Sequence, residues 1–384
     1  MTIGEVCSTI SDTYRAKADK VTLINTSDVL EGKVLNHTRV PNKELKGQFK
    51  KTFKKNDILY SEIRPQNKRF AFVDFNPVDY IASTKLMVLR ADASKVLPMY
   101  LYFYLKSAPV VAELQMLAET RSGTFPQITF TELSTLSIPV PSITEQELII
   151  STIKCIEDKI DYNAEINDNL YEMVNAYYIS LFKDVECEMT TIGSYAKRIY
   201  SGGTPTTSND AYWNGAFGWF SSGETRNRFV ITTEKSITQA GVNNSSTKLA
   251  TKHDIVMASA GQGFTRGQTS MLLIDTYVNQ SVIVIHAERN VLPYLFWNLA
   301  NRYEELRAIS DSSSIRGSLT TKMIAAFEIP LANDETLQAF ADFSWSIIPQ
   351  IENNLLENEH LTALRDSLLP KLMSGEIDVS DIRF

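Results

Sequence analysis

Two copies of one sequence pattern follow each other along the chain. Ile138-Pro139 ends a segment whose counterpart ends at Ile329-Pro330, and Asp57-Ile58 corresponds to Asp254-Ile255. The offset stays close to about 190 residues between all such pairs, which excludes a solenoid of short repeats. A chain of 384 residues is long enough for two hydrophobic cores. The duplication therefore predicts two similar globular domains, each followed by one long helix.

Each copy contains patterns typical of both strands and helices. The runs Tyr80 to Leu89 and Tyr277 to His286 are rich in β-branched residues and predict strands. Leu97-Pro98 and Leu292-Pro293 begin apolar segments with a proline near the first turn, which predicts buried helices. We therefore expect α+β domains with a largely antiparallel or mixed sheet.

Long heptad patterns follow both globular segments. In the first, apolar residues and two asparagines alternate by four and three: Ile149, Ile153, Ile156, Ile160, Asn163, Asn167, Leu170, Val174, Tyr177 and Leu181. The same spacing recurs in the second copy at Phe340, Ser344, Ile347, Ile351, Asn354, Asn358, Leu361, Arg365, Leu368 and Leu372. Each helix alone would expose an apolar stripe, so we expect them to pair as an antiparallel coiled coil with a pseudo-twofold relation.

The asparagines at equivalent places in both seams predict a fixed register. A slipped pairing would leave a buried amide unsatisfied, so we expect Asn163 and Asn167 to lie close to Asn354 and Asn358. Pro349 predicts a kink, or a helix that begins again near Ile348. The expected boundaries are residues 1–143 and 185–332 for the globular domains, with spacer helices at 144–184 and 333–378.

Composition excludes some classes of protein. No run of about 18 apolar residues predicts a membrane span, and the first residues do not resemble a secretory signal. Cys7, Cys155 and Cys187 are scattered without metal-ligand spacing, which favours a cytoplasmic protein. The net charge is −7, but lysines and arginines gather between Lys43 and Arg69. Net charge therefore does not exclude nucleic acid as a partner.

Motifs for catalysis are weak. Ser201 to Pro205 reads SGGTP and lacks the ending of a phosphate-binding P-loop. The four histidines have no metal-ligand spacing, so we expect no bound metal. Two alternatives stay open at this point. One is a metal-dependent DNA nuclease or nickase that uses Asp28 and Glu44, and the other is a protein-binding coiled-coil scaffold.

Several motifs, in this order and in duplicate, resemble one known family. They are SGGTP, the segment from Trp219 to Glu224, the run from His253 to Gln268, VNQSV at Val278 to Val282, both Ile-Pro junctions, and LLPKLMSGEIDV at Leu368 to Val379. The chain thereby resembles, over essentially its whole length, the specificity (S) subunit of type I restriction-modification enzymes.

That resemblance implies a non-catalytic subunit that reads double-stranded DNA. Its two target-recognition domains would each read half of a bipartite, asymmetric site, and its helices would set the spacing and hold methyltransferase (M) subunits. S-adenosylmethionine would belong to the M subunits. ATP and Mg²⁺ would belong to restriction (R) subunits that join the complex. No cofactor is expected in this chain.

Residue types suited to phosphate and base-edge contacts mark candidate DNA-binding positions in both domains. In the first domain they are Thr26, Ser27, Ser61, Arg64, Gln66, Lys68, Arg69, Arg121 and Gln127. In the second they are Ser201, Thr204, Ser221, Arg226, Arg228, Ser259, Gln262, Thr265, Arg266, Gln268 and Arg316. A solvated surface role is the alternative for each.

The segment from Ser201 to Glu224 is a predicted recognition loop of the second domain. We expect its aromatic side chains, among them Trp219 and Phe220, to anchor the loop in the core. Its hydroxyls and its glycine amides would then face the DNA backbone. The first domain has no SGGTP, so the two domains are expected to read different bases.

Overall fold

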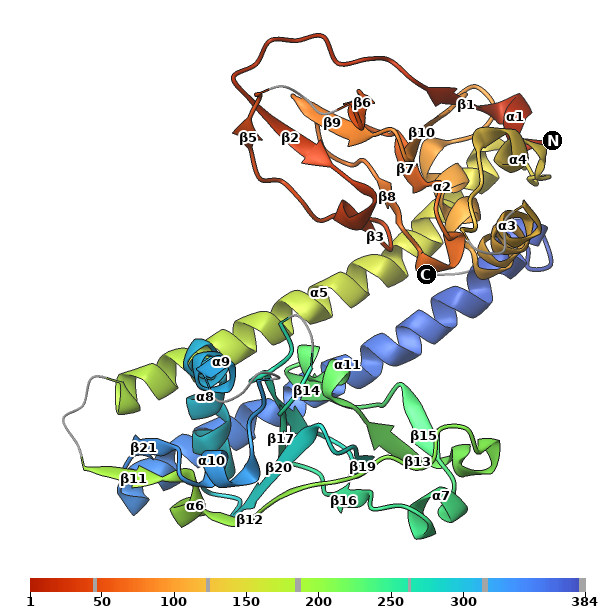
Figure 1. The fold of residues 1–384 in the computed structure, drawn as a ribbon. Helices are drawn as coiled ribbons and strands as arrows, with labels where there is room; N and C mark the ends of the chain where they lie inside the picture. Colours follow the sequence, from red (N-terminus) through yellow and green to blue (C-terminus); the bar gives the residue numbers. More distant parts are fainter. Residues whose placement is uncertain (44–46, 122–124, 184–187, 262–263, 313–316, 380–384) are drawn as a thin grey trace. The chain divides into compact units, whose positions relative to one another are not determined.

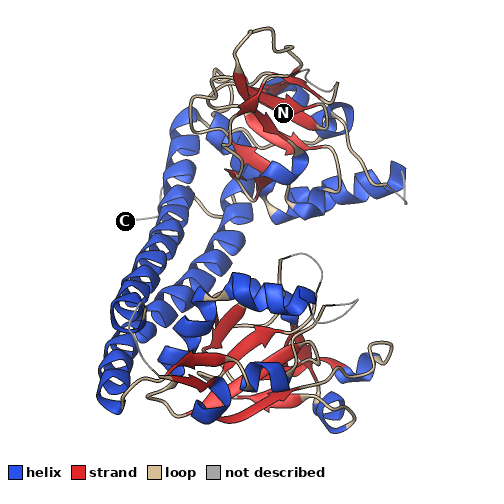
Figure 2. Ribbon diagram, turned by 60° about the vertical axis from the view of Figure 1, so that its left-hand side comes forward, coloured by secondary structure: helices blue, strands red, loops and turns tan. Residues whose placement is uncertain are grey.

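The computed structural model describes residues 1–43, 47–121, 125–183, 188–261, 264–312 and 317–379. It divides into two compact units, each holding one copy of the repeat and part of both long helices (Figure 1). Unit 1 consists of Met1–Ile160 and His360–Phe384, and unit 2 is Asp161–Glu359. Both units mix strands with helices, as Figure 2 shows, which confirms the predicted α+β class.

Unit 1 contains two four-stranded sheets and a small hairpin. The first sheet has the order β1 (Cys7–Ile10), β10 (Leu86–Ala91), β7 (Ile58–Ser61), β8 (Phe70–Phe72). The second has the order β5 (Val40–Pro41), β2 (Lys20–Ile24), β9 (Tyr80–Ser83), β6 (Phe49–Lys51), in which β2 and β9 are parallel. The hairpin joins β3 (Val29–Leu30) to β4 (Lys33–Val34), and the shorter helices are α1 (Ile3–Val6), α2 (Pro98–Lys106), α3 (Ala108–Arg121) and α4 (Phe130–Thr135).

Unit 2 repeats this strand order and adds a fifth strand to the first sheet. Its first sheet runs β12 (Ala196–Ser201), β20 (Val282–Ala287), β17 (Ile255–Ala258), β18 (Thr269–Leu272), β14 (Phe229–Val230). Its second runs β15 (Lys235–Ile237), β13 (Trp213–Phe220), β19 (Thr276–Val278), β16 (Lys248–Ala250), again with one parallel pair, β13 and β19. A third sheet pairs β11 (Met189–Thr191) with β21 (Glu328–Pro330), and the shorter helices are α6 (Ile192–Tyr195), α7 (Gln239–Asn243), α8 (Leu292–Asn301), α9 (Tyr303–Ser312) and α10 (Thr321–Ala325).

The two runs predicted as single strands are each two strands of different sheets. The run from Tyr80 to Leu89 divides into β9 and β10, and its counterpart divides into β19 and β20. Side chains make the turns between them: Ser83 Oγ accepts the Lys85 N–H at 3.3 Å, and Asn279 Oδ1 accepts the Ser281 N–H at 2.9 Å. The chain therefore crosses from one sheet to the other inside a continuous apolar run, which local patterning cannot reveal.

The predicted buried helices are present. α2 begins at Pro98, and α8 has Pro293 in its first turn, where the missing N–H costs nothing. α8 is buried along most of its length, and its Trp297 has no exposed surface. In each unit this helix packs in the same hydrophobic core as a segment of the long helices.

The long helices α5 (Ile143–Phe182) and α11 (Asp334–Ser374) pair antiparallel. In unit 2, Asn163 Nδ2 donates to Asn358 Oδ1 at 2.9 Å, and Asn354 Nδ2 donates to Asn167 Oδ1 at 2.8 Å. As the residue number increases along α5, the number of its partner on α11 decreases, so the two helices run in opposite directions. In unit 1, Arg365 lies 3.7 Å from Glu157 on the facing helix.

Pro349 does not end α11, which continues as one helix from Asp334 to Ser374. The prediction that the helix begins again near Ile348 is therefore wrong. Pro349 lies on the exposed side, next to the buried pair Ile347 and Ile348. The carbonyl that loses its helical N–H partner is that of Trp345, in the preceding turn.

Candidate nucleic-acid interface

The Asp-Ile pair repeated in both units builds the scaffold and does not face a ligand. Asp57 is fully buried, accepts the Lys54 N–H at 2.8 Å, and binds the Arg90 guanidinium through two contacts of 2.7 Å. Its hydrogen bonds to Arg90 raise the pKa of that guanidinium. In unit 2, Asp254 accepts the Thr251 N–H and contacts His286 Nδ1 at 2.6 Å. Each aspartate thus holds the entry to a central strand.

Two loops of unit 1 bring several predicted residues together. The short helix η1 (Thr26–Asp28) follows β2, and the loop between β7 and β8 contains η2 (Pro65–Asn67). Arg69 Nη1 donates to the carbonyl oxygens of Ser27 at 3.0 Å and Val29 at 3.3 Å. Arg69 therefore acts as a tie between the loops. Thr26 and Ser27 lie beside it, with Ser27 exposed.

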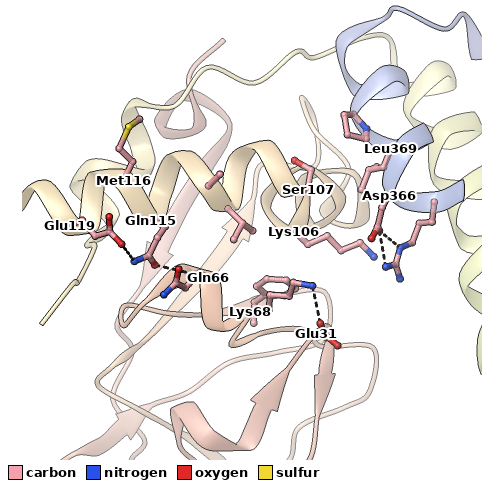
Figure 3. A pocket seen from close by; sticks show the side chains of 16 residues that line it. Glu31, Gln66, Lys68, Lys106, Ser107, Gln115, Met116, Glu119, Asp366 and Leu369 are labelled. Atoms are coloured by element: carbon pink, nitrogen blue, oxygen red, sulfur yellow. Dashed lines mark hydrogen bonds and ion pairs between the residues drawn. The ribbon is translucent and has the colours of Figure 1, made fainter. Parts of the chain in front are cut away.

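Gln66 and Lys68 line a pocket of about 550 Å³ together with residues of α3 and α11 (Figure 3). Lys68 is paired with Glu31 at 3.0 Å, and both side chains are more than half exposed. An exposed pair of this kind contributes little to stability, so a phosphate can replace the carboxylate at small cost. The backbone N–H of Gln66 donates to Gln115 Oε1 at 3.2 Å, and the residue is exposed.

The other predicted residues of unit 1 differ in accessibility. Arg64 is exposed and has a left-handed backbone, with φ of 45°. Gln127 accepts from Lys85 Nζ at 3.2 Å. Ser61 is only 2% exposed, and its hydroxyl bonds the backbone of Ile63, so it supports the loop instead of facing solvent. The side chain of Arg121 lies outside the described part of the chain.

The SGGTP segment of unit 2 is packed against its own domain. The Gly202 N–H donates to the Asn279 carbonyl at 3.3 Å, and the Gly203 N–H donates to the Val278 carbonyl at 3.1 Å. A Cβ at Gly202 would lie 1.9 Å from the Val278 oxygen, so glycine is required by close packing. The expectation that these amides face DNA is therefore wrong. The hydroxyl of Thr204 bonds Gln280, while Ser201 ends β12 half-buried.

The aromatic side chains anchor this segment, as predicted. Trp219 and Phe220 are buried, and Trp219 Nε1 donates to the Gly203 carbonyl at 3.3 Å. Trp213 meets Trp219 edge to face, with 5.0 Å between ring centroids. The loop is thereby attached to the sheet that contains β13.

Three further candidates follow β13, in or next to the short helix η4 (Ser222–Arg226). Ser221 forms a capping box with Glu224, whose carboxylate accepts both its N–H and its hydroxyl. Arg226 is paired with Glu234 and is exposed. Arg228 donates to Asp168 on α5 at 3.1 Å, and its guanidinium lies 4.2 Å from the centroid of the Tyr171 ring. Arg228 thus fastens unit 2 to its own helix.

The loop between β17 and β18 is fastened to α9. Arg266 contacts Ser310 Oγ at 3.3 Å and Asp311 at 2.7 Å, and its side chain is only 15% exposed. Ser259 is buried, Thr265 is half-buried, and the Gln268 side-chain oxygen is buried without a partner among the described residues. Gln262 and Arg316 lie outside the described residues.

Comparison with known proteins identifies the family. The family model described as "Type I restriction modification DNA specificity domain" matches residues 1–172 and 185–361, one match for each copy of the repeat. The chain belongs to this family. It is the DNA-specificity subunit of a type I restriction-modification system.

Relatives agree with this assignment along most of the chain. The HindI specificity subunit of Haemophilus influenzae is 29% identical over 98% of both chains. The EcoR124I/EcoR124II specificity subunit of Escherichia coli is 28% identical over 72% of this chain and 68% of its own. The crystal structure of the S subunit from M. genitalium has the same fold, with a TM-score of 0.58 at 18% identity, covering 97% of this chain and 95% of that one.

In this specificity subunit only one of the two residues suggested for a nuclease, Asp28, can be placed. Asp28 accepts the Asn25 N–H at 2.7 Å and caps η1, while Glu44 lies outside the described residues. Across the described ranges, no group of three or more His, Cys, Asp or Glu side chains is placed to hold a metal ion. None of the helices among those residues is long and apolar enough to cross a membrane.

The sequence did not predict the residues that position the candidate side chains. Ser310 and Asp311 of α9 hold Arg266, and Asp168 of α5 holds Arg228. These partners are separated from the arginines by about 45 to 60 residues. A charged residue on a helix surface gives no local sign of such a contact, because a solvated position has the same pattern.

Proposed function

We propose that each unit reads one half of a bipartite, asymmetric duplex site. The observation that supports this most directly is that the units share one strand order but differ in the loops that carry polar side chains. SGGTP occurs only in unit 2, and the η1–η2 pair of loops carries the exposed Arg64 and Gln66 only in unit 1. Similar scaffolds that carry different loops suit two different half-sites.

In unit 1, Arg64 and Gln66 are the proposed base-reading residues. Both are exposed, and neither side chain has a partner in the part of the chain that the structure describes. Arginine reads guanine and glutamine reads adenine through paired hydrogen bonds in the major groove. Ser27, Lys68 and Arg69 lie nearby and are proposed to contact phosphates, with Thr26 and Gln127 as neighbours.

Substitution of Arg64 or Gln66 by Ala is expected to relax the first half-site alone. Each change should cost about 1–3 kcal/mol of discrimination at one base pair. Binding to a duplex library measures this, and the second half-site serves as an internal control because unit 2 is unchanged. Equal loss at both half-sites, or unchanged preference at the first, would contradict the assignment.

In unit 2, the proposed contacts come from Ser201, Thr204 and Ser221 at the recognition segment, and from Arg226 beside them. The loop between β17 and β18 contributes Thr265 and Gln268 as further proposed contacts. Ser61 and Ser259 are assigned a supporting role because they are buried, and Arg228 and Arg266 because they are bound to the helices α5 and α9. Gln262, Arg316 and Arg121 stay predicted contacts.

The helices are proposed to hold methyltransferase subunits. Within unit 2, α5 carries an apolar stripe beside its seam, formed by Tyr162 (60% exposed), Ile166 (40%) and Met173 (47%). The spacing of four and seven places these side chains on one face, as a further helix packing alongside would require. S-adenosylmethionine and the chemistry on adenine would belong to the M subunits, and ATP and Mg²⁺ to R subunits, all in the cytoplasm.

The proposal is tested by assembly. The isolated chain should not methylate DNA, whereas the chain mixed with its M subunit should methylate adenine at one bipartite sequence. Exchange of residues 1–143 for those of a relative should change one half of that sequence and preserve the other. Methylation with unchanged sequence after the exchange would refute it, and magnesium-dependent cleavage by the isolated chain would favour the nuclease alternative.

A further inference from the structure

Two cations and one aromatic ring form a patch on unit 2 outside the predicted recognition residues. Arg198 and Tyr200 lie on β12, and Lys248 begins β16. The Arg198 guanidinium and the Lys248 ammonium each lie 5.7 Å from the centroid of the Tyr200 ring. Together with Ile199 and Leu249 they line a cavity of about 550 Å³. We call Arg198, Tyr200 and Lys248 the β12–β16 patch.

The ring of this patch is fixed and uncharged. Tyr200 packs on a core cluster of unit 2, and its hydroxyl donates to the Leu249 carbonyl at 2.8 Å. Burial raises the pKa of Tyr200 to about 12, so the phenol stays protonated under physiological conditions. A neutral ring whose face already attracts two cations holds them in place without neutralising them.

The cations of the patch are available to an anion. Both side chains are exposed, and neither forms an ion pair with a carboxylate in the described ranges. The neighbouring Lys197 gives the contrast, because it is paired with Glu288 at 2.5 Å. Two unpaired cations at one site produce a local positive potential that attracts an anion, although the net charge of the chain is −7.

One hydroxyl group extends the patch toward the recognition segment. Ser246 precedes Lys248 by two residues, whereas Ser201 follows Tyr200 on β12 and so lies on the opposite face of the strand. A Cβ at Gly203 would lie 2.0 Å from Ser246 Oγ, so the SGGTP segment and this second loop touch. Cations with neighbouring hydroxyls are the groups that contact DNA phosphates.

The first unit has no such patch at the corresponding strand positions. Tyr200 pairs with Val284, and Ile10 of unit 1 pairs with Val88, which is the equivalent residue of the repeat. By this register, Ser8 stands for Arg198 and Ile10 stands for Tyr200. Lys248 has a lysine counterpart, Lys51, but Lys51 Nζ donates to the carbonyl oxygens of Thr84 and Leu86 in its own unit. The patch therefore does not follow from the shared scaffold.

We propose that the β12–β16 patch binds backbone phosphates of duplex DNA and anchors the second reader independently of base sequence. The proposal rests on the proposed DNA-reading function. Arg198 and Lys248 would each neutralise one phosphate, and the Tyr200 ring would keep the two cations apart at a fixed place. The patch would add affinity and orientation for unit 2, while base selection stays with the recognition segment.

The test is the salt dependence of DNA binding by the assembled complex of this chain with its M subunits. The double variant Arg198→Ala/Lys248→Ala should lose affinity equally for the cognate duplex and for a scrambled one. Its slope of log affinity against log salt should be shallower by about 1.8, since each phosphate contact contributes about 0.9. The ratio of the affinity of the unaltered protein to that of the double variant should therefore fall about 12-fold between 50 and 200 mM salt.

Lys197→Ala is the matched control, because it removes a paired cation from the same strand and should leave the slope nearly unchanged. Arg198→Glu should weaken binding further than Arg198→Ala. An unchanged slope in the double variant, a changed base preference, or a defect only in M-subunit assembly would overturn the proposal. If the unaltered complex binds no duplex, the proposed function fails instead, so the two failures are distinguishable.

Discussion

Asp57→Ala is expected to destabilise unit 1 by about 3 kcal/mol, because it leaves Arg90 without its carboxylate and the Lys54 N–H without its acceptor. The Asp57 side chain is 1% exposed, while that of Arg90 is 29% exposed. Water can therefore solvate the arginine only in part. Hydrogen exchange at β7 and β10 measures the effect, and protection there should fall by roughly 100-fold.

Arg90→His is the matched control for this prediction. By strand register, Arg90 corresponds to His286 of unit 2, which contacts Asp254 at 2.6 Å. The repeat therefore already uses histidine opposite the same aspartate, and Arg90→His should cost much less than Asp57→Ala. Equal loss of protection in both variants would show that packing volume, and not the aspartate's hydrogen bonds, holds these strands.

The parts of the fold that follow from local periodicity were predictable. A heptad seam is visible in sequence because its apolar residues return every three or four positions, so both long helices and their antiparallel pairing could be inferred. The path of the chain between Ser83 and Leu86 could not be predicted from local periodicity. It depends on which strands the flanking residues meet, and these strands come from distant parts of the sequence.

The candidate interface was predictable only by residue type. Arg64 and Arg228 look alike in sequence, yet the first side chain is exposed at a loop and the second lies on Tyr171 of the long helix. Arg198 was missed because it stands in a strand pattern beside Lys197, where two basic residues indicate no more than a solvated edge. In the structure, Lys197 is paired with Glu288, whereas Arg198 lies over the Tyr200 ring.

Replacing Asn163, Asn167, Asn354 and Asn358 together by Leu is expected to raise the melting temperature by about 5 °C and to permit wrong registers. A single substitution, by contrast, is expected to lower the stability. Asn163 is 1% exposed and donates to both Asn358 and Glu357. Asn163→Leu alone removes these two bonds and should destabilise unit 2 by about 1–2 kcal/mol.

The opposite signs arise because a single change leaves the partner amide buried without its hydrogen bond, whereas the fourfold change removes both members of each pair. Asn163 bonds the counterpart of Asn167, and Asn354, the counterpart of Asn163, bonds Asn167. A shift of one heptad that brings Asn163 opposite Ile351 would place all four amides against isoleucines. Cysteine pairs placed for the native and the shifted register report which one forms.

Asn169→Leu/Asn353→Leu makes the same chemical change at exposed positions and should alter neither register nor melting temperature by much. If the fourfold variant still cross-links only in the native register, the asparagines do not determine it and apolar packing along the seam does.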